Sequence, residues 1–157
     1  MASDRRDGMT YAPTGPSRPV VKPGEFVFAA AHLDHGHIYG QCNGLIEAGA
    51  ELRWVYDPDP TKVDAFVARY PGTRVARALD EVLDDPEVRL LAAAAVPSER
   101  CDLGIRVREA GKDYFTDKAP LTTLEQLARA RDAVARTGRK YLAYYSERIP
   151  TESGGRA

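Results

Sequence analysis

The chain has 157 residues, of which 43% are hydrophobic and 29% charged, and its formal net charge is -1. This length suits one globular domain, which buries about two thirds of the surface that its unfolded chain exposes. Acidic and basic residues are interspersed, so the sequence lacks the basic stripe typical of nucleic-acid binding. No apolar run reaches the roughly 18 residues of a membrane span, and the start lacks the apolar centre of a signal peptide. We therefore expect a cytoplasmic protein that binds neither nucleic acid nor membranes.

The two ends of the chain differ in composition from its centre. Residues 1–24 are rich in Pro, Gly, Ser and charge, which favours a disordered arm, and residues 150–157 have the composition of a flexible tail. Cys42 and Cys101 are far apart and in no metal-binding spacing, which indicates reduced thiols packed inside the protein. The folded domain is expected over residues 25–149.

Within that domain, strand-like and helix-like segments alternate. The continuous apolar run "EFVFAAAH" (25–32) predicts a buried strand, and residues 36–48 carry apolar side chains at helical spacing. Thr122 and Glu125 have the capping-box spacing at the start of the last predicted helix. The other predicted strands cover 51–56, 73–76, 88–96, 113–117 and 140–145, and the other helices 61–70, 78–85, 98–111 and 122–138. This alternation predicts an α/β fold with a doubly wound, mostly parallel sheet in three α/β/α layers.

The loop "HLDHGH" (32–37) follows the first predicted strand, where open parallel sheets bind their ligands. It stands in the place of a dinucleotide-binding GxGxxG loop, with His32, Asp34 and His37 at the glycine positions. Asp34 would repel a pyrophosphate, although a short acid can also cap the following helix, and Gly36 supplies one flexible point.

Three interpretations of this loop remain open. It could contact a cofactor, with imidazole N–H groups in place of glycine amides, or it could be a structural loop without a ligand. A metal site is the interpretation we favour least, and we predict no metal, because His35 and His37 are two residues apart at a helix start and should point to different sides.

Asp57 ends the second predicted strand, 25 residues after His32. This is the place of the acid that accepts hydrogen bonds from an adenine ribose, but Asp57 could equally cap the turn "DPDP". An acid here favours NAD over NADP because it repels a 2′-phosphate, and the nearby Lys62 weakens that preference.

Three longer segments are similar to a known family. They are "YDPDPTKVDAFVARYPG", "LDEVLDDPEVRLLAAAAVPSER" and "EAGKDYFTDKAPLTTLEQLARARDAVARTGRKYLAYYSERI". From about Glu25 to Ile149 the chain resembles the N-terminal domain of the glucose-fructose oxidoreductase, inositol dehydrogenase and MocA (Gfo/Idh/MocA) family. The resemblance implies a Rossmann fold that binds NAD or NADP, and hydride transfer to or from sugars, polyols or related small molecules.

The resemblance also implies roles for single residues. The triplet Asp117-Lys118-Ala119 matches the family's Glu-Lys-Pro, in which the lysine lies near the nicotinamide and the substrate, so Lys118 is the expected catalytic residue. Tyr145 and Arg148 are expected on the substrate side. The expected cofactor-binding residues are His32, Leu33, Asp34, His35, Gly36, His37, Asp57, Val96, Pro97, Asp117 and Lys118.

Family members have a second α/β domain that carries the general acid/base group, and this sequence ends before it. Two functions are therefore expected for the chain: the nucleotide-binding domain of an NAD(P)-dependent oxidoreductase, or a non-catalytic Rossmann module that binds nucleotide weakly or serves in assembly. By itself the chain is expected to transfer hydride slowly or not at all, because nothing in it holds a substrate over the nicotinamide. Association into a homo-oligomer is left open.

Overall fold

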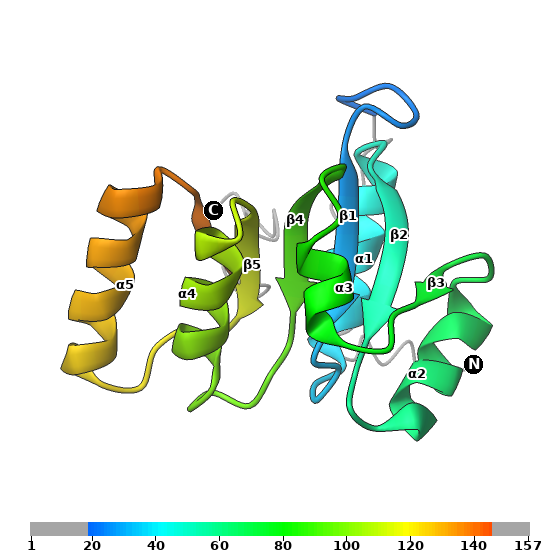
Figure 1. The fold of residues 1–157 in the computed structure, drawn as a ribbon. Coiled ribbons are helices and arrows are strands. Elements are labelled where there is room, and N and C mark those ends of the chain that lie inside the picture. Colours follow the sequence, from blue (N-terminus) through cyan, green and yellow to red (C-terminus); the bar gives the residue numbers. More distant parts are fainter. Residues whose placement is uncertain (1–18, 146–157) are drawn as a thin grey trace, which may run out of the picture.

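The computed structural model describes residues 19–145, which form one parallel sheet with helices on both sides (Figure 1). The strand order is β3-β2-β1-β4-β5-β6, and every neighbouring pair is parallel. This order reverses between β1 and β4, as in doubly wound dinucleotide-binding folds, and confirms the predicted fold class. The strands are β1 (Val27–Ala31), β2 (Glu51–Tyr56), β3 (Arg74–Val75), β4 (Val88–Ala93), β5 (Asp113–Asp117) and β6 (Tyr141–Tyr144). The helices are α1 (His37–Glu47), α2 (Pro60–Arg69), α3 (Leu79–Leu83), α4 (Arg100–Glu109) and α5 (Leu124–Thr137).

The central strands β1 and β4 are covered on both faces, which explains their continuous apolar sequences. On one face they pack with Ile38 and Cys42 of α1 and with α2. On the other face they pack with α3 and α4, which lie in front of the sheet in Figure 1. The alanines of β1 and β4 are fully buried, and their small side chains let the helices approach the sheet closely.

Two predicted details differ from the structure. The last part of the expected disordered arm, residues 19–24, is placed against the turn between α1 and β2, because the N–H groups of Val20 and Val21 donate to the carbonyl of Ala48. Composition alone does not reveal such backbone contacts; residues 1–18 and the predicted tail lie outside the described residues. The N-cap of α5 is Thr123, whose hydroxyl accepts the Gln126 N–H at 3.0 Å, and not Thr122.

Membrane spans were sought in residues 19–145, and no helix there has the length and apolar character to cross a bilayer.

A close helix–sheet contact at Gly104 of α4 generates a stability prediction. A Cβ added there would lie 2.5 Å from Cδ1 of the buried Tyr114 ring and 2.9 Å from Cε2 of Tyr141. We expect Gly104→Ala to lower the free energy of unfolding by about 1–3 kcal/mol, because a rigid aromatic pair must shift. Gly44→Ala in α1 is the matched control: its Cβ would meet nothing within 4 Å, and better helix propensity should stabilise by up to about 1 kcal/mol. Urea unfolding measures both, and equal stability of the two variants would contradict the close contact.

Candidate functional site

A cavity of about 270 Å³ lies where the carboxyl ends of β1, β4 and β5 meet. In open parallel sheets this edge, near the reversal of strand order, is the usual ligand site. The cavity brings together predicted site residues from three separate loops. Its lining consists of Asp34, His35, His37, Ala95, Val96, Pro97, Arg100, Asp117 and Lys118.

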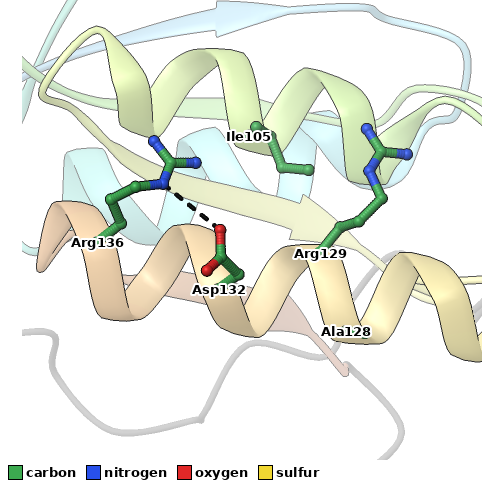
Figure 2. A pocket seen from close by; sticks show the side chains of 5 residues that line it. All are labelled: Ile105, Ala128, Arg129, Asp132 and Arg136. Atoms are coloured by element: carbon green, nitrogen blue, oxygen red, sulfur yellow. Dashed lines mark hydrogen bonds and ion pairs between the residues drawn. The ribbon is translucent and has the colours of Figure 1, made fainter.

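A second cavity, of about 400 Å³, lies between α4 and α5, away from the strand ends (Figure 2). Ile105 and Ala128 contribute its apolar surface. Its charged groups are half to three-quarters exposed and already paired: Arg136 contacts Asp132 at 3.4 Å and Glu109 at 3.0 Å. Exposed pairs of this kind contribute little energy, and this cavity contains none of the predicted site residues. The cavity at the strand ends is therefore the candidate site.

The backbone at His32 has the conformation that the replaced glycine would favour. Its φ angle is +51°, and it is the one non-glycine residue with positive φ between residues 19 and 145. The His32 N–H donates to the Tyr56 carbonyl at 3.1 Å, and its carbonyl accepts the Ala94 N–H at 3.0 Å. Histidine tolerates this left-handed region better than most residues. The tight turn after β1 is thus kept without a glycine.

The Asp57 carboxylate lies inside the protein and binds two backbone amides. It accepts the Leu33 N–H at 2.6 Å and the Asp59 N–H at 2.8 Å, and its side chain is 1% exposed. The second contact is the turn cap expected for "DPDP", and the first ties this turn to the loop after β1. Contact with a ribose stays a prediction, and it would require the carboxylate to turn outward.

The charge of Asp34 is offset by Lys62. Lys62 Nζ lies 2.5 Å from Asp34 Oδ1 and 3.9 Å from Asp57 Oδ1. The hydrogen bond with Asp34 is the main reason why the pKa of Lys62 is raised. Asp34 does not cap α1: the N-cap is Gly36, without a side-chain hydrogen bond, and no acid stands in the first turn.

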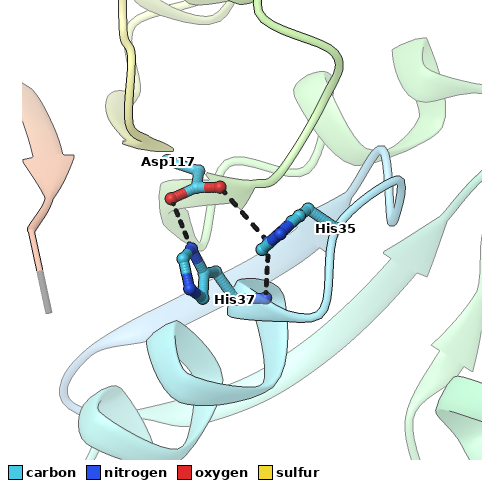
Figure 3. Close-up of side chains that lie close together, drawn as sticks. All are labelled: His35, His37 and Asp117. Carbon is cyan, nitrogen blue, oxygen red and sulfur yellow. Dashed lines mark hydrogen bonds and ion pairs between the residues drawn. The ribbon is translucent and has the colours of Figure 1, made fainter. Parts of the chain in front are cut away.

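His35 and His37 both face Asp117, at the end of β5 (Figure 3). His37 Nδ1 is 2.9 Å from Asp117 Oδ1, and His35 Nδ1 is 3.5 Å from Asp117 Oδ2. The centroids of the two imidazole rings are 4.2 Å apart. The expectation that the two imidazoles point to different sides is wrong. The helix begins only at His37, so the backbone at Gly36 can direct His35 to the same carboxylate.

Arg100 is a site residue that the sequence analysis missed. Its side chain is 3% exposed and donates to the carbonyls of Ala95 (2.6 Å), Lys118 and Ala119 (3.1 Å). A fourth contact joins it to Asp117 Oδ2 at 3.3 Å. Arginine is mostly exposed in proteins, and nothing in the sequence around Arg100 indicates that its side chain is buried.

Lys118 follows β5 and lines the cavity, and its backbone N–H donates to Asp117 Oδ1 at 2.7 Å. Val96 and Pro97 line the same cavity from the loop after β4. Tyr145 is 44% exposed just past β6, outside the cavity lining, and Arg148 lies outside the described residues.

Both cysteines are buried, as expected for packed thiols. Burial raises the pKa of Cys42, and Cys101, whose pKa burial also raises, contacts the Gln126 carbonyl through Sγ at 3.3 Å. Neither thiol is in the cavity lining, which removes both from the candidate chemistry.

Comparisons with solved structures agree with this architecture. A protein classed as an oxidoreductase from Erwinia carotovora atroseptica is 44% identical, with a TM-score of 0.76 over 79% of this chain and 37% of that one. The WlbA dehydrogenase of Bordetella pertussis, in complex with NADH and UDP-GlcNAcA, has 20% identity and a TM-score of 0.73, over 83% of this chain and 39% of that one. GenD2 from gentamicin A biosynthesis, in complex with NAD, has 20% identity and a TM-score of 0.70, over 84% and 37% of the two chains. The last two likenesses concern the fold alone.

The chain thus spans less than two fifths of each of these three structures. A search of curated proteins gives no match. Residues 29–145 match the family described as "Oxidoreductase family, NAD-binding Rossmann fold". With the strand order and the loop positions above, this match shows that the chain belongs to the Gfo/Idh/MocA oxidoreductases, as an NAD-binding Rossmann domain.

Proposed function

We propose that this domain presents NAD, in preference to NADP, for hydride transfer to or from a sugar, polyol or related small molecule. The observation that carries the proposal is the single cavity in which the start of α1, the loop after β4 and Lys118 meet. Two similar structures are complexes with NAD or NADH, and one of them also holds UDP-GlcNAcA. The substrate class rests on family membership and on these neighbours.

The start of α1 is suited to a pyrophosphate even though glycines are missing. A helix N-terminus carries a partial positive charge and attracts phosphate. Here the N-cap residue Gly36 has no side chain, a single α1 amide (His37 N–H) donates to the His35 side chain, and Lys62 offsets the charge of Asp34 that would otherwise oppose a phosphate. The left-handed turn at His32 lets the backbone follow the path of a glycine loop. The residues present therefore fit the phosphate portion of the cofactor.

We propose Lys118 as the residue at the nicotinamide and substrate end of the cavity. It follows the carboxyl end of β5 and lines the same cavity as Pro97, His35 and His37. An ammonium group at this place can orient a substrate hydroxyl and assist the proton transfer that accompanies hydride transfer.

The preference for NAD rests on the charges around the end of β2. Asp57 and Asp59 stand together there, and two carboxylates would repel a 2′-phosphate. Lys62, the cation closest to them in the described contacts, is already paired with Asp34 at 2.5 Å. Lys62 is thus less available to a phosphate than the sequence alone suggests.

One observation favours the second expected function, a module that binds nucleotide only weakly. Both Asp57 oxygens accept backbone amides, and its side chain is 1% exposed, so a ribose could reach the remaining lone pairs only if the carboxylate moved outward. The affinity for NAD separates the two functions.

Calorimetric titration with NADH, NAD, NADPH and NADP, in buffer with EDTA, tests the proposal. We expect saturable binding, tighter for NAD(H) than for NADP(H) by at least about tenfold, which is about 1.4 kcal/mol.

Gly36→Asp should weaken binding by at least about tenfold, because it puts an anion at the α1 N-terminus, while aspartate is a good N-cap and preserves the helix. Lys118→Ala should keep the affinity for NAD within about threefold.

The absence of heat with all four dinucleotides at millimolar concentration would contradict cofactor binding by this domain. A large loss of affinity in Lys118→Ala would show that the lysine binds the cofactor instead of serving the substrate.

The buried Arg100 should matter for the stability of the segment that carries Lys118. Arg100→Met removes the donors to three carbonyls and leaves Asp117 buried without its guanidinium partner. We expect a loss of about 3–5 kcal/mol in the free energy of unfolding, as for other broken buried pairs. The matched control is Arg106→Met in the same helix, whose pair with Asp80 is exposed and should contribute at most about 1 kcal/mol. Denaturant unfolding measures both; similar losses would contradict the anchoring role.

A further inference from the structure

We infer that His35, His37 and Asp117 form a site for one divalent transition-metal ion of the zinc class. Each of the three side chains offers one ligand atom, and these atoms lie within 4.8 Å of one another. The residues come from the loop after β1 and from the end of β5, so the fold itself brings them together (Figure 3). The inference concerns metal binding and does not depend on the proposed redox function.

The spacing of the ligand atoms is close to that of a coordinated ion. Zinc binds imidazole nitrogen and carboxylate oxygen at about 2.0–2.2 Å, which puts tetrahedral ligand atoms roughly 3.3–3.6 Å apart. The two nitrogen–oxygen distances here are 2.9 Å and 3.5 Å, and they end on different oxygens of Asp117. All three ligand atoms lie within 4.8 Å of one another, so side-chain rotations that shorten the longest spacing would place them around one ion.

The hydrogen bonds at His35 leave a place for a cation. The His37 backbone N–H donates to His35 Nδ1 at 3.2 Å, so this nitrogen carries no proton in that arrangement. The same nitrogen lies 3.5 Å from Asp117 Oδ2, and two acceptors then face each other without a hydrogen between them. An ion at this point would replace the hydrogen bond from the His37 backbone N–H to His35 Nδ1. It would also replace the proton shared between His37 Nδ1 and Asp117 Oδ1.

Surrounding contacts fix the orientation of the carboxylate. Asp117 accepts the Lys118 N–H on Oδ1 and contacts Arg100 through Oδ2, and second contacts of this kind commonly orient metal ligands. The Arg100 guanidinium also offsets the carboxylate charge, so the two imidazoles must supply most of the affinity. Imidazole ligands favour zinc, cobalt or nickel over magnesium and calcium, which prefer oxygen.

The site would keep an open coordination position. The His35 side chain is 54% exposed, and the three residues line the cavity that also contains Lys118. Three protein ligands with a fourth position left to water or a small ligand is the arrangement typical of exchangeable, non-structural zinc sites.

Calorimetric titration of the EDTA-stripped chain with ZnCl₂, without any dinucleotide, tests the inference. We expect one zinc ion per chain, and no comparable binding of Mg²⁺. Co²⁺ should give visible d–d absorption that reports its ligand set. His35→Gln, His37→Gln and Asp117→Asn should each weaken zinc binding by at least about tenfold.

His32→Asn is the matched control. It removes the third histidine of the same loop, which is not among the three residues of the cluster, and asparagine tolerates the left-handed backbone at this position. It should keep zinc affinity within about twofold.

Lack of saturable zinc binding, or a loss in His32→Asn equal to that in His37→Gln, would overturn the inference. If Asp117→Asn does not fold, His35→Gln decides, because its imidazole is half exposed and its replacement should leave thermal unfolding unchanged. The zinc titration contains no dinucleotide, and the dinucleotide titration contains EDTA. Zinc binding and dinucleotide binding are therefore tested independently, and one can be absent while the other is present.

Discussion

The contact between Arg100 and Asp117 connects the parts of the site. Both side chains are almost fully buried, and a buried charge is tolerated only where it is paired and hydrogen-bonded. Arg100 reaches from the first turn of α4 to the segment after β5, and Asp117 reaches from β5 to His37 at the start of α1. Through this pair, three strand ends are held together around one cavity, and Lys118 follows directly from it.

The loop after β1 shows how a dinucleotide-binding turn can be kept with histidine and aspartate in place of glycine. The turn itself is preserved by the left-handed backbone at His32, and its path is fixed by the bond from Leu33 N–H to Asp57. The charge introduced by Asp34 is offset by Lys62. The loop therefore depends on residues at the end of β2 and in α2, and the glycine motif alone would not describe it.

The sequence predicts those features that depend on local patterns. The segments 51–56 and 113–117 coincide with β2 and β5, because each is a strand-like run between turn residues, and the continuous apolar character of β4 identifies a central strand. The first residue of a helix is harder to predict: Thr122 and Thr123 both contact Gln126, but only the Thr123 hydroxyl accepts the Gln126 backbone N–H, which identifies Thr123 as the N-cap.

Contacts between distant residues could not be predicted in this way. His37 and Asp117 are 80 positions apart, and no spacing rule relates them. The expectation that His35 and His37 diverge assumed a helix through both, whereas α1 begins at the second. The burial of Arg100 likewise depends on the carbonyl groups of Lys118 and Ala119 in another loop. A local sequence pattern does not predict that these groups lie near Arg100.

The charges that line the cavity limit what it can bind. Asp117 pairs with Arg100, and Asp34 pairs with Lys62, which is not a lining residue, so these four charges cancel and Lys118 adds one positive charge to the lining. A divalent ion at the three-residue cluster would add two more positive charges in a partly enclosed space, where electrostatic interactions are stronger than in water. A pyrophosphate carries two negative charges and would bring the opposite excess. Within this lining, a metal ion and an anionic ligand therefore favour each other on charge alone.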